Sequence, residues 1–290
     1  MRTRLIFVLL VGAAACTVRR VEPATGSRSA AGEVVPLQES QRVPASEVDV
    51  AARLARSPRH GEWVTIAVGT PDSLRAYVVY PERSTRAPVV VVVHEIFGLS
   101  SWVRGVADQL AADGYIAIAP DLLTGKGPRQ DDSLSYDDAR RLIAGLRPAD
   151  VQRDLEAAAR YAMTLPAALP RYGIVGFCWG GGVSFAHAVE SPTGLSAAVV
   201  YYGVSPAAGD LSRIGVPVLG LYGGNDARVD ATVPGADSAM KAMGKSFEPH
   251  IFAGAGHGFL RAQEVSPANR DASRQGWPLT VSFFRTHLGA

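Results

Sequence analysis

The chain has 290 residues, of which 47% are hydrophobic and 19% are charged, so it can bury a sizeable core and is too apolar to be disordered or fibrous. Its 29 basic and 27 acidic side chains nearly balance, and removing the two arginines of the first fifteen residues leaves 27 of each. This balance argues against nucleic acid or anionic lipid as a partner. The two cysteines, Cys16 and Cys178, are too few for a disulfide framework.

Residues 1–15 are typical of a secretory signal. Arg2 and Arg4 precede an unbroken run of apolar or small residues, Leu5 to Ala15, which is shorter than the roughly 20 residues that span a bilayer. The alanines before Cys16 fit cleavage after Ala15, and the same stretch resembles the lipobox of bacterial lipoproteins, in which the cysteine is acylated. We therefore expect an exported protein, either periplasmic or anchored to a membrane through lipid on Cys16. No other membrane contact is expected.

The next segment, residues 16–60, has the composition of a linker. It is rich in Ser, Ala, Glu, Arg and Pro and holds few large apolar residues, with one short helix expected around residues 46–56. We predict a flexible tether here and a folded domain over residues 61–290.

From residue 62 onward, strand-like and helix-like segments alternate, beginning with a hairpin of two alternating strands. The β-branched run over residues 88–93 is typical of a strand buried on both faces of a parallel sheet. The alternation predicts one α/β domain, with a doubly wound, mostly parallel sheet and helices on both faces. The expected strands are residues 62–68, 74–80, 88–93, 115–119, 171–177, 196–202, 216–222 and 247–253. The expected helices are residues 102–113, 150–165, 180–190, 231–243 and 274–288.

A candidate nucleophile follows the strand that ends at Phe177. The segment Gly176-Phe177-Cys178-Trp179-Gly180 has the pattern of a nucleophile elbow in which cysteine replaces serine. Glycines suit this strained strand-to-helix turn because it leaves no room for side chains beside the nucleophile. The following helix directs its N-terminus at the sulfur, which favours a thiolate and any developing anion.

Two further strand ends supply the partners of that nucleophile. Asp226 lies 48 residues beyond Cys178, and His257 lies 31 residues beyond Asp226. Nucleophile, acid, histidine is the chain order of α/β hydrolases, so His257 is expected to accept the thiol proton and Asp226 to orient the imidazole. Asp230 is the weaker candidate for the acid because it lies further from its strand. No cluster has metal-ligand spacing, and neither a metal nor a cofactor is expected.

These motifs resemble those of the dienelactone hydrolase family of α/β hydrolases. The resemblance covers the chain from about residue 64 to its end. It rests on residues 93–99 (VHEIFGL), 114–115 with 119–122 (GY and APDL), 176–181 (GFCWGG), 201–203 (YYG), and the segments around Asp226 and His257.

The resemblance implies roles for residues around the triad. In the family, the carboxylate that matches Glu95 interacts with the resting cysteine and helps to form the thiolate when substrate arrives. A carboxylate beside a sulfur also disfavours a second negative charge, so we expect a protonated Cys178 at rest. Fold position and resemblance together assign the oxyanion hole to the backbone N–H groups of Ile96 and Trp179.

Substrate-binding residues are also implied. Arg261 matches a family arginine that holds a substrate carboxylate, a task that suits the bidentate guanidinium. A second family arginine has no match at the expected spacing, and three residues are available for it, namely Arg129, Arg140 and Arg141. The candidates for the pocket lining, each of which could equally be core, are Tyr202, Phe97 and Trp102.

The expected function is hydrolysis of a small-molecule ester or lactone through an acyl-thioester intermediate. One alternative is a non-catalytic exported binding protein on a hydrolase fold, which the presence of every triad position disfavours. A second alternative is a peptidase of the same fold, which peptide turnover would distinguish. The sequence assigns neither a physiological substrate nor an oligomeric state.

Overall fold

The structure is a computed structural model that describes residues 43–69, 72–127 and 135–289. The predicted signal, the lipidation site at Cys16 and the first part of the predicted linker lie outside the described residues. Within these ranges, no helix is both long and apolar enough to cross a bilayer.

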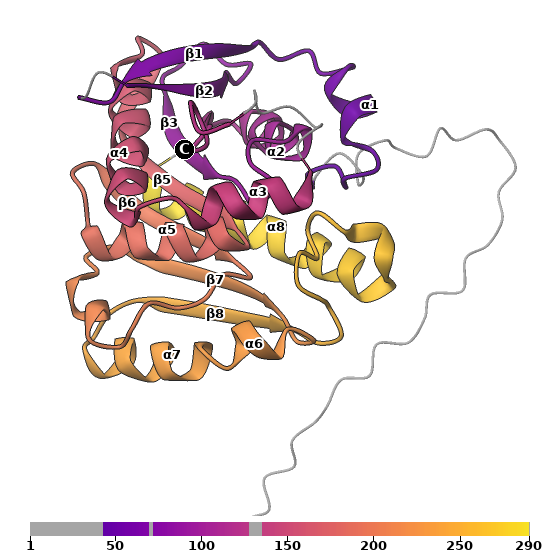
Figure 1. The fold of residues 1–290 in the computed structure, drawn as a ribbon, viewed down its shortest axis with the longest axis vertical. Coiled ribbons are helices and arrows are strands. Elements are labelled where there is room, and N and C mark those ends of the chain that lie inside the picture. Colours follow the sequence, from indigo (N-terminus) through magenta and orange to yellow (C-terminus); the bar gives the residue numbers. More distant parts are fainter. Residues whose placement is uncertain (1–42, 70–71, 128–134, 290) are drawn as a thin grey trace, which may run out of the picture. The chain divides into compact units, whose positions relative to one another are not determined.

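An eight-stranded sheet forms the centre of the domain, in the order β1-β2-β4-β3-β5-β6-β7-β8 (Figure 1). Strand β2 runs antiparallel to β1 and β4, and the other neighbours pair in parallel. The predicted fold class is confirmed. The bounds are β1 Gly61–Ala67, β2 Ser73–Val79, β3 Ala87–Val93, β4 Ile116–Pro120, β5 Ala168–Phe177, β6 Leu195–Tyr201, β7 Val218–Gly223 and β8 Phe247–Phe252.

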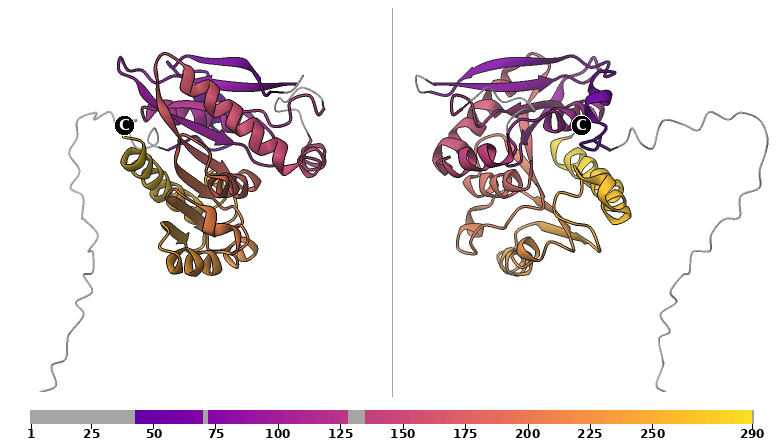
Figure 2. Two further views of the ribbon diagram at one scale, coloured as in Figure 1. Left: turned by 90° about the vertical axis from the view of Figure 1, so that its left-hand side faces the viewer. Right: turned by 45° about the vertical axis from the view of Figure 1, so that its right-hand side comes forward.

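Helices cover both faces of the sheet (Figure 2). Helices α4, α5 and α7 pack on one face, while α2 and α8 pack on the other and α1 lies against α2. The bounds are α1 Val50–Leu54, α2 Ser101–Ala112, α3 Tyr136–Ala144, α4 Pro148–Thr164, α5 Trp179–Glu190, α6 Ala227–Asp230, α7 Val233–Ala242 and α8 Pro267–Leu288.

Strand β3 shows why the central strands have continuous apolar sequences. Val89, Val91 and Val93 belong to the core beneath α4, α5 and α7. Val90 and Val92 belong to the opposite core, beneath α2 and α8. Because successive side chains point to opposite faces and both faces are covered, every position is apolar. This burial fixes the carboxyl end of β3, from which Glu95 follows.

Three helices differ from the expectation. Helices α3 and α6 were not expected, and α8 begins at Pro267 rather than near residue 274. The start of α8 has a local signal, because the hydroxyl of Ser266 accepts from the backbone N–H of Asn269 and a proline occupies the first turn. Gly276 and Pro278 lie inside α8. Because both are poor helix formers, the sequence pattern does not indicate a helix over its first turns.

Residues 43–60 pack on the domain, so the folded part starts earlier than the predicted boundary at residue 61. Val43, Ala45 and Val50 are buried in the core beside α2. The indole Nε1–H of Trp102 donates to the carbonyl of Ala45 at 3.1 Å. The segment is polar on average, so its composition predicts a linker. Its few apolar residues nevertheless pack beside α2.

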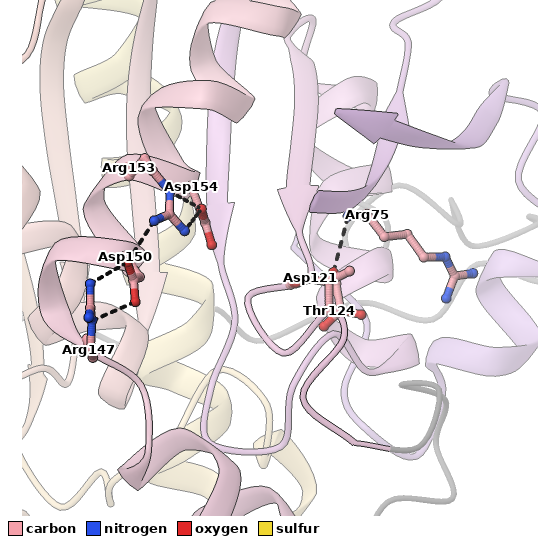
Figure 3. A network of polar contacts seen from close by, with 7 residues as sticks. All are labelled: Arg75, Asp121, Thr124, Arg147, Asp150, Arg153 and Asp154. Carbon is pink, nitrogen blue, oxygen red and sulfur yellow. Dashed lines mark hydrogen bonds and ion pairs between the residues drawn. The ribbon is translucent and has the colours of Figure 1, made fainter. Parts of the chain in front are cut away.

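The start of α4 carries a network of ion pairs (Figure 3). Asp150 lies 2.9 Å from Nε of Arg147 and 2.7 Å from Nη1 of Arg153, which also reaches Asp154 at 2.9 Å. Asp150 sits in the first helical turn, where a negative charge is favoured by the helix dipole. The network lies at the end of α4 that lines the cavity described below.

Figure 3 also shows how the loop after β4 is tied to β2. The backbone N–H of Arg75 donates to the hydroxyl of Thr124 at 3.1 Å, and the backbone N–H of Asp121 donates to the carbonyl of Arg75 at 2.8 Å. The turn that follows β4 therefore extends the pairing with β2 beyond the strand itself.

Candidate active site

Cys178 occupies a strained turn between β5 and α5. Its backbone has φ 57° and ψ −118°, a conformation that L-residues rarely adopt. A Cβ atom on Gly176 would lie 1.9 Å from the carbonyl oxygen of Gly180, and one on Gly180 would lie 2.3 Å from that of His94. The glycines of the motif are therefore required by close backbone approach, as the sequence predicts.

The structure brings Cys178, His257 and Asp226 together. The sulfur of Cys178 lies 3.0 Å from Nε2 of His257, and Nδ1 of the same ring contacts Oδ2 of Asp226. An ionised carboxylate only accepts, so Nδ1 carries the hydrogen and Nε2 is free to accept from the thiol. Asp230, the weaker candidate, forms no hydrogen bond or ion pair with His257 among the described residues.

The loops after β7 and β8 hold the acid and the imidazole side by side. The backbone N–H of Gly224 donates to the carbonyl of Phe252, and that of Asn225 donates to the carbonyl of Ala255, each at 2.9 Å. These bonds lock the two loops together just before Asp226 and His257. Asp226 is 9% exposed, so its carboxylate meets the ring away from bulk water.

The surroundings of Cys178 favour a protonated thiol at neutral pH. Burial, and after it the charge of Glu95, raises the pKa of Cys178 to about 11. The backbone N–H of Trp179 and the charges of Arg228 and Arg261 act in the opposite direction but do not offset this. The electrostatics thus agree with the resting thiol expected from the sequence.

Glu95 pairs with Arg261 rather than with the sulfur. Its carboxylate is 3% exposed, and its Oε2 lies 2.8 Å from Nε of Arg261. Burial raises the pKa of Glu95 to about 7, although the guanidinium lowers it. Arg261 also forms an ion pair with Glu47 and lies over the ring of Phe97 at 4.7 Å. The arginine that the resemblance assigns to a substrate carboxylate is therefore already in contact with two carboxylates of the chain.

A cavity of about 890 Å³ opens above the sulfur. Eight of the predicted site residues line it, namely Cys178, His257, Glu95, Ile96, Trp179, Arg261, Tyr202 and Phe97, whereas Asp226 lies behind His257 and does not. Trp102 is not part of it, because its ring is buried in the core against Phe177. The other side chains that line the cavity are mostly apolar and come from α4, α5 and the loops that follow α3 and β6, including Leu146, Pro148, Val151, Val183, Val204 and Pro206.

Tyr202 lies just after β6 with φ 41° and lines the cavity. Its ring packs 5.2 Å from that of His257, centroid to centroid. Its hydroxyl is buried and has no hydrogen-bond partner among the described residues.

Two arginines that line the cavity are candidates for the second family arginine, which the sequence left unassigned. Arg140, on α3, lines the cavity, whereas Arg141 pairs with Asp138 and does not, and Arg129 lies outside the described residues. Arg228, on α6, also lines the cavity and was not expected there. Its position two residues after Asp226 was the one available signal.

No group of three or more His, Cys, Asp or Glu side chains within the described ranges is arranged to hold a metal ion.

The sheet order, with a candidate nucleophile between a strand and a helix, defines an α/β hydrolase. The chain belongs to the dienelactone hydrolase family, whose model matches residues 74–288. A protein of Salmonella typhimurium assigned as a carboxymethylenebutenolidase is 33% identical over 237 residues, which cover 75% of this chain and 84% of the relative. A Yersinia pestis protein with the same assignment is 32% identical over 228 residues, covering 74% and 85%.

A comparison with solved structures points to the same family. A protein of Klebsiella pneumoniae assigned as a dienelactone hydrolase superposes with a TM-score of 0.68 at 28% identity, covering 78% of this chain and 98% of that one. Family membership makes the chain a hydrolase that acts on lactones or esters.

The charge of Glu95 predicts the response of the thiol to mutation. Replacing Glu95 with glutamine is expected to lower the pKa of Cys178 from about 11, because a nearby negative charge is removed and the thiolate becomes less unfavourable. The pKa should stay above that of a free cysteine, since burial is the larger cause. Ultraviolet difference titration of the thiolate measures it, with Glu248→Gln as an exposed control. A wild-type thiolate at neutral pH, or an unmoved titration in Glu95→Gln, would contradict this account.

Proposed function

We propose that the chain hydrolyses an ester or lactone bond of a small molecule with a Cys178-His257-Asp226 triad, through an acyl-thioester intermediate. The observation that carries the proposal is the chain of contacts from the sulfur to Nε2 of His257 at 3.0 Å and from Nδ1 to Asp226, beside a cavity of substrate size. Nucleophile, base and orienting acid in this geometry are the arrangement that nucleophilic acyl transfer needs.

The geometry suits a concerted first step. Because the resting thiol is protonated, His257 accepts its proton as the sulfur attacks the carbonyl carbon. The carbonyl oxygen gains the negative charge, which the backbone N–H groups of Ile96 and Trp179 stabilise. When the tetrahedral intermediate collapses, the bond to the leaving oxygen breaks and that oxygen takes the proton from His257.

Deacylation uses the same groups in reverse. His257 removes a proton from water, which attacks the thioester carbonyl, and the oxyanion is again held by Ile96 and Trp179. Collapse releases the carboxylic acid product, and the sulfur leaves and regains its proton from His257. Asp226 stabilises the imidazolium in both halves and stays ionised throughout.

The test is turnover by the full chain on a panel that contains p-nitrophenyl acetate, a dienelactone and a peptide. Acid quenching followed by mass spectrometry should detect an acyl group on the peptide that contains Cys178. Turnover of the peptide without turnover of the esters would favour the peptidase, and the absence of any turnover would favour the non-catalytic binding protein.

We also propose that the protein is exported and carries either an N-terminus created by cleavage after Ala15 or a lipid on Cys16. The support is the basic start and the short apolar run of residues 1–15. Mass spectrometry of the N-terminal peptide from fractionated bacteria distinguishes the two forms. An intact, unmodified N-terminus at Met1 in the cytoplasmic fraction would contradict the proposal.

A further inference from the structure

The segment before β1 contributes a carboxylate to the surroundings of the cavity. Glu47 forms an ion pair with Nη1 of Arg261, and its backbone N–H donates to the carbonyl oxygen of Arg261 at 2.9 Å. Arg261 lines the cavity together with Cys178 and His257. Glu47 therefore acts on the site through the arginine that would otherwise be available to a ligand.

The position of Glu47 is set by contacts on the preceding residues. Pro44 accepts a hydrogen bond from Nε2 of Gln263 at 2.9 Å, and Ala45 accepts one from Nε1 of Trp102 at 3.1 Å. Ala45 itself is buried. These contacts do not depend on the glutamate side chain, so its replacement should leave the segment in place.

The charges around Arg261 then disfavour another anion. One guanidinium faces the buried carboxylate of Glu95 and the carboxylate of Glu47, whose side chain is 61% exposed. A substrate carboxylate at the same place would be the third negative group around a single positive charge. Like charges at such short range repel, and more strongly where the arginine is partly buried.

We propose that Glu47 is a specificity-determining residue that occupies Arg261 in place of a substrate carboxylate and directs the site toward substrates that are uncharged at that end. The inference rests on the proposed function, because it needs a reaction at Cys178. Glu47 lies before the residues that the family model matches, 74–288, so family membership does not assign this role.

The experiment compares two esters with the same leaving group and chain length, p-nitrophenyl pentanoate and p-nitrophenyl hydrogen glutarate. They differ only in a terminal methyl or carboxylate group. In the full chain, Glu47→Gln should raise the ratio of kcat/KM for the glutarate ester over kcat/KM for the pentanoate ester by about tenfold. This is the lower end of the factor that a hydrogen bond to a charged group contributes. The change should arise mainly in KM for the glutarate ester, with pentanoate hydrolysis little altered.

Two further variants make the result specific. Glu264→Gln removes another glutamate that pairs with an arginine, Arg270 at 2.9 Å, and should leave the ratio unchanged. Adding Arg261→Gln to Glu47→Gln should abolish the gain, because the gain requires the released guanidinium. Hydrolysis of pentanoate with an unchanged ratio in Glu47→Gln overturns this inference alone. No hydrolysis of either ester by the wild type overturns the proposed function and this inference with it.

Discussion

Replacing Cys178 with alanine is expected to lower kcat/KM for ester and lactone hydrolysis by at least about a thousandfold. The substitution removes the sulfur that lies 3.0 Å from Nε2 of His257, so no nucleophile remains at the strand end. Activity on p-nitrophenyl acetate and on a dienelactone should fall together, because both use the same acyl-thioester step.

The loss should be catalytic rather than structural. Alanine keeps the Cβ atom, so the strain of the left-handed backbone at φ 57° is unchanged and the elbow should fold as before. The melting temperature of the variant should therefore stay close to that of the wild type. Turnover within about tenfold of the wild type would place the nucleophile elsewhere, since a working triad does not tolerate loss of its nucleophile.

The candidate triad could be predicted from the sequence because each of its members follows a strand directly. Cys178 comes after an apolar run and between glycines, and Asp226 and His257 come after two later strands. In a parallel sheet the carboxyl ends of neighbouring strands lie at one edge, so order along the chain is enough to bring the three together. The mutual geometry, including the sulfur-to-nitrogen distance, needed the structure.

The pairing of Arg261 could not be predicted in the same way. Glu47 and Arg261 are 214 residues apart, and no periodicity links two single charges over that distance. The segment that carries Glu47 has linker composition, yet Val43, Ala45 and Val50 are enough to bury it. Composition averages over a segment, whereas docking depends on a few positions.

The missed helix α3 is a different case, because its signals were local. The hydroxyl of Ser135 accepts from the backbone N–H of Asp138 at 3.1 Å, and acidic residues fill the first turn. Among residues 137–144 of this helix, only Ala139 and Ile143 are buried, so the apolar stripe there is too short to stand out. The capping pattern at Ser135 therefore indicates this helix better than its hydrophobic periodicity does.

Replacing Asp226 with asparagine is expected to lower kcat by about ten-thousandfold. A carboxylate can only accept a hydrogen bond and so keeps the hydrogen of His257 on Nδ1, whereas the amide of asparagine can donate to Nδ1. The hydrogen would then move to Nε2, the atom that must accept the thiol proton. The variant would also lose the negative charge that stabilises the imidazolium during both steps.

The substitution should act on kcat and leave KM nearly unchanged, because Asp226 does not line the cavity. Asp230→Asn is the matched control: it makes the same chemical change four residues away on α6, at a carboxylate that is not paired with His257 among the described residues. Steady-state kinetics of the two variants on p-nitrophenyl acetate separate the roles. Equal losses in both would mean that negative charge near α6 matters in general, and that the tautomer of His257 is not what Asp226 controls. A loss confined to Asp226→Asn, with KM preserved, is the result expected if the carboxylate works by orienting and stabilising the imidazole.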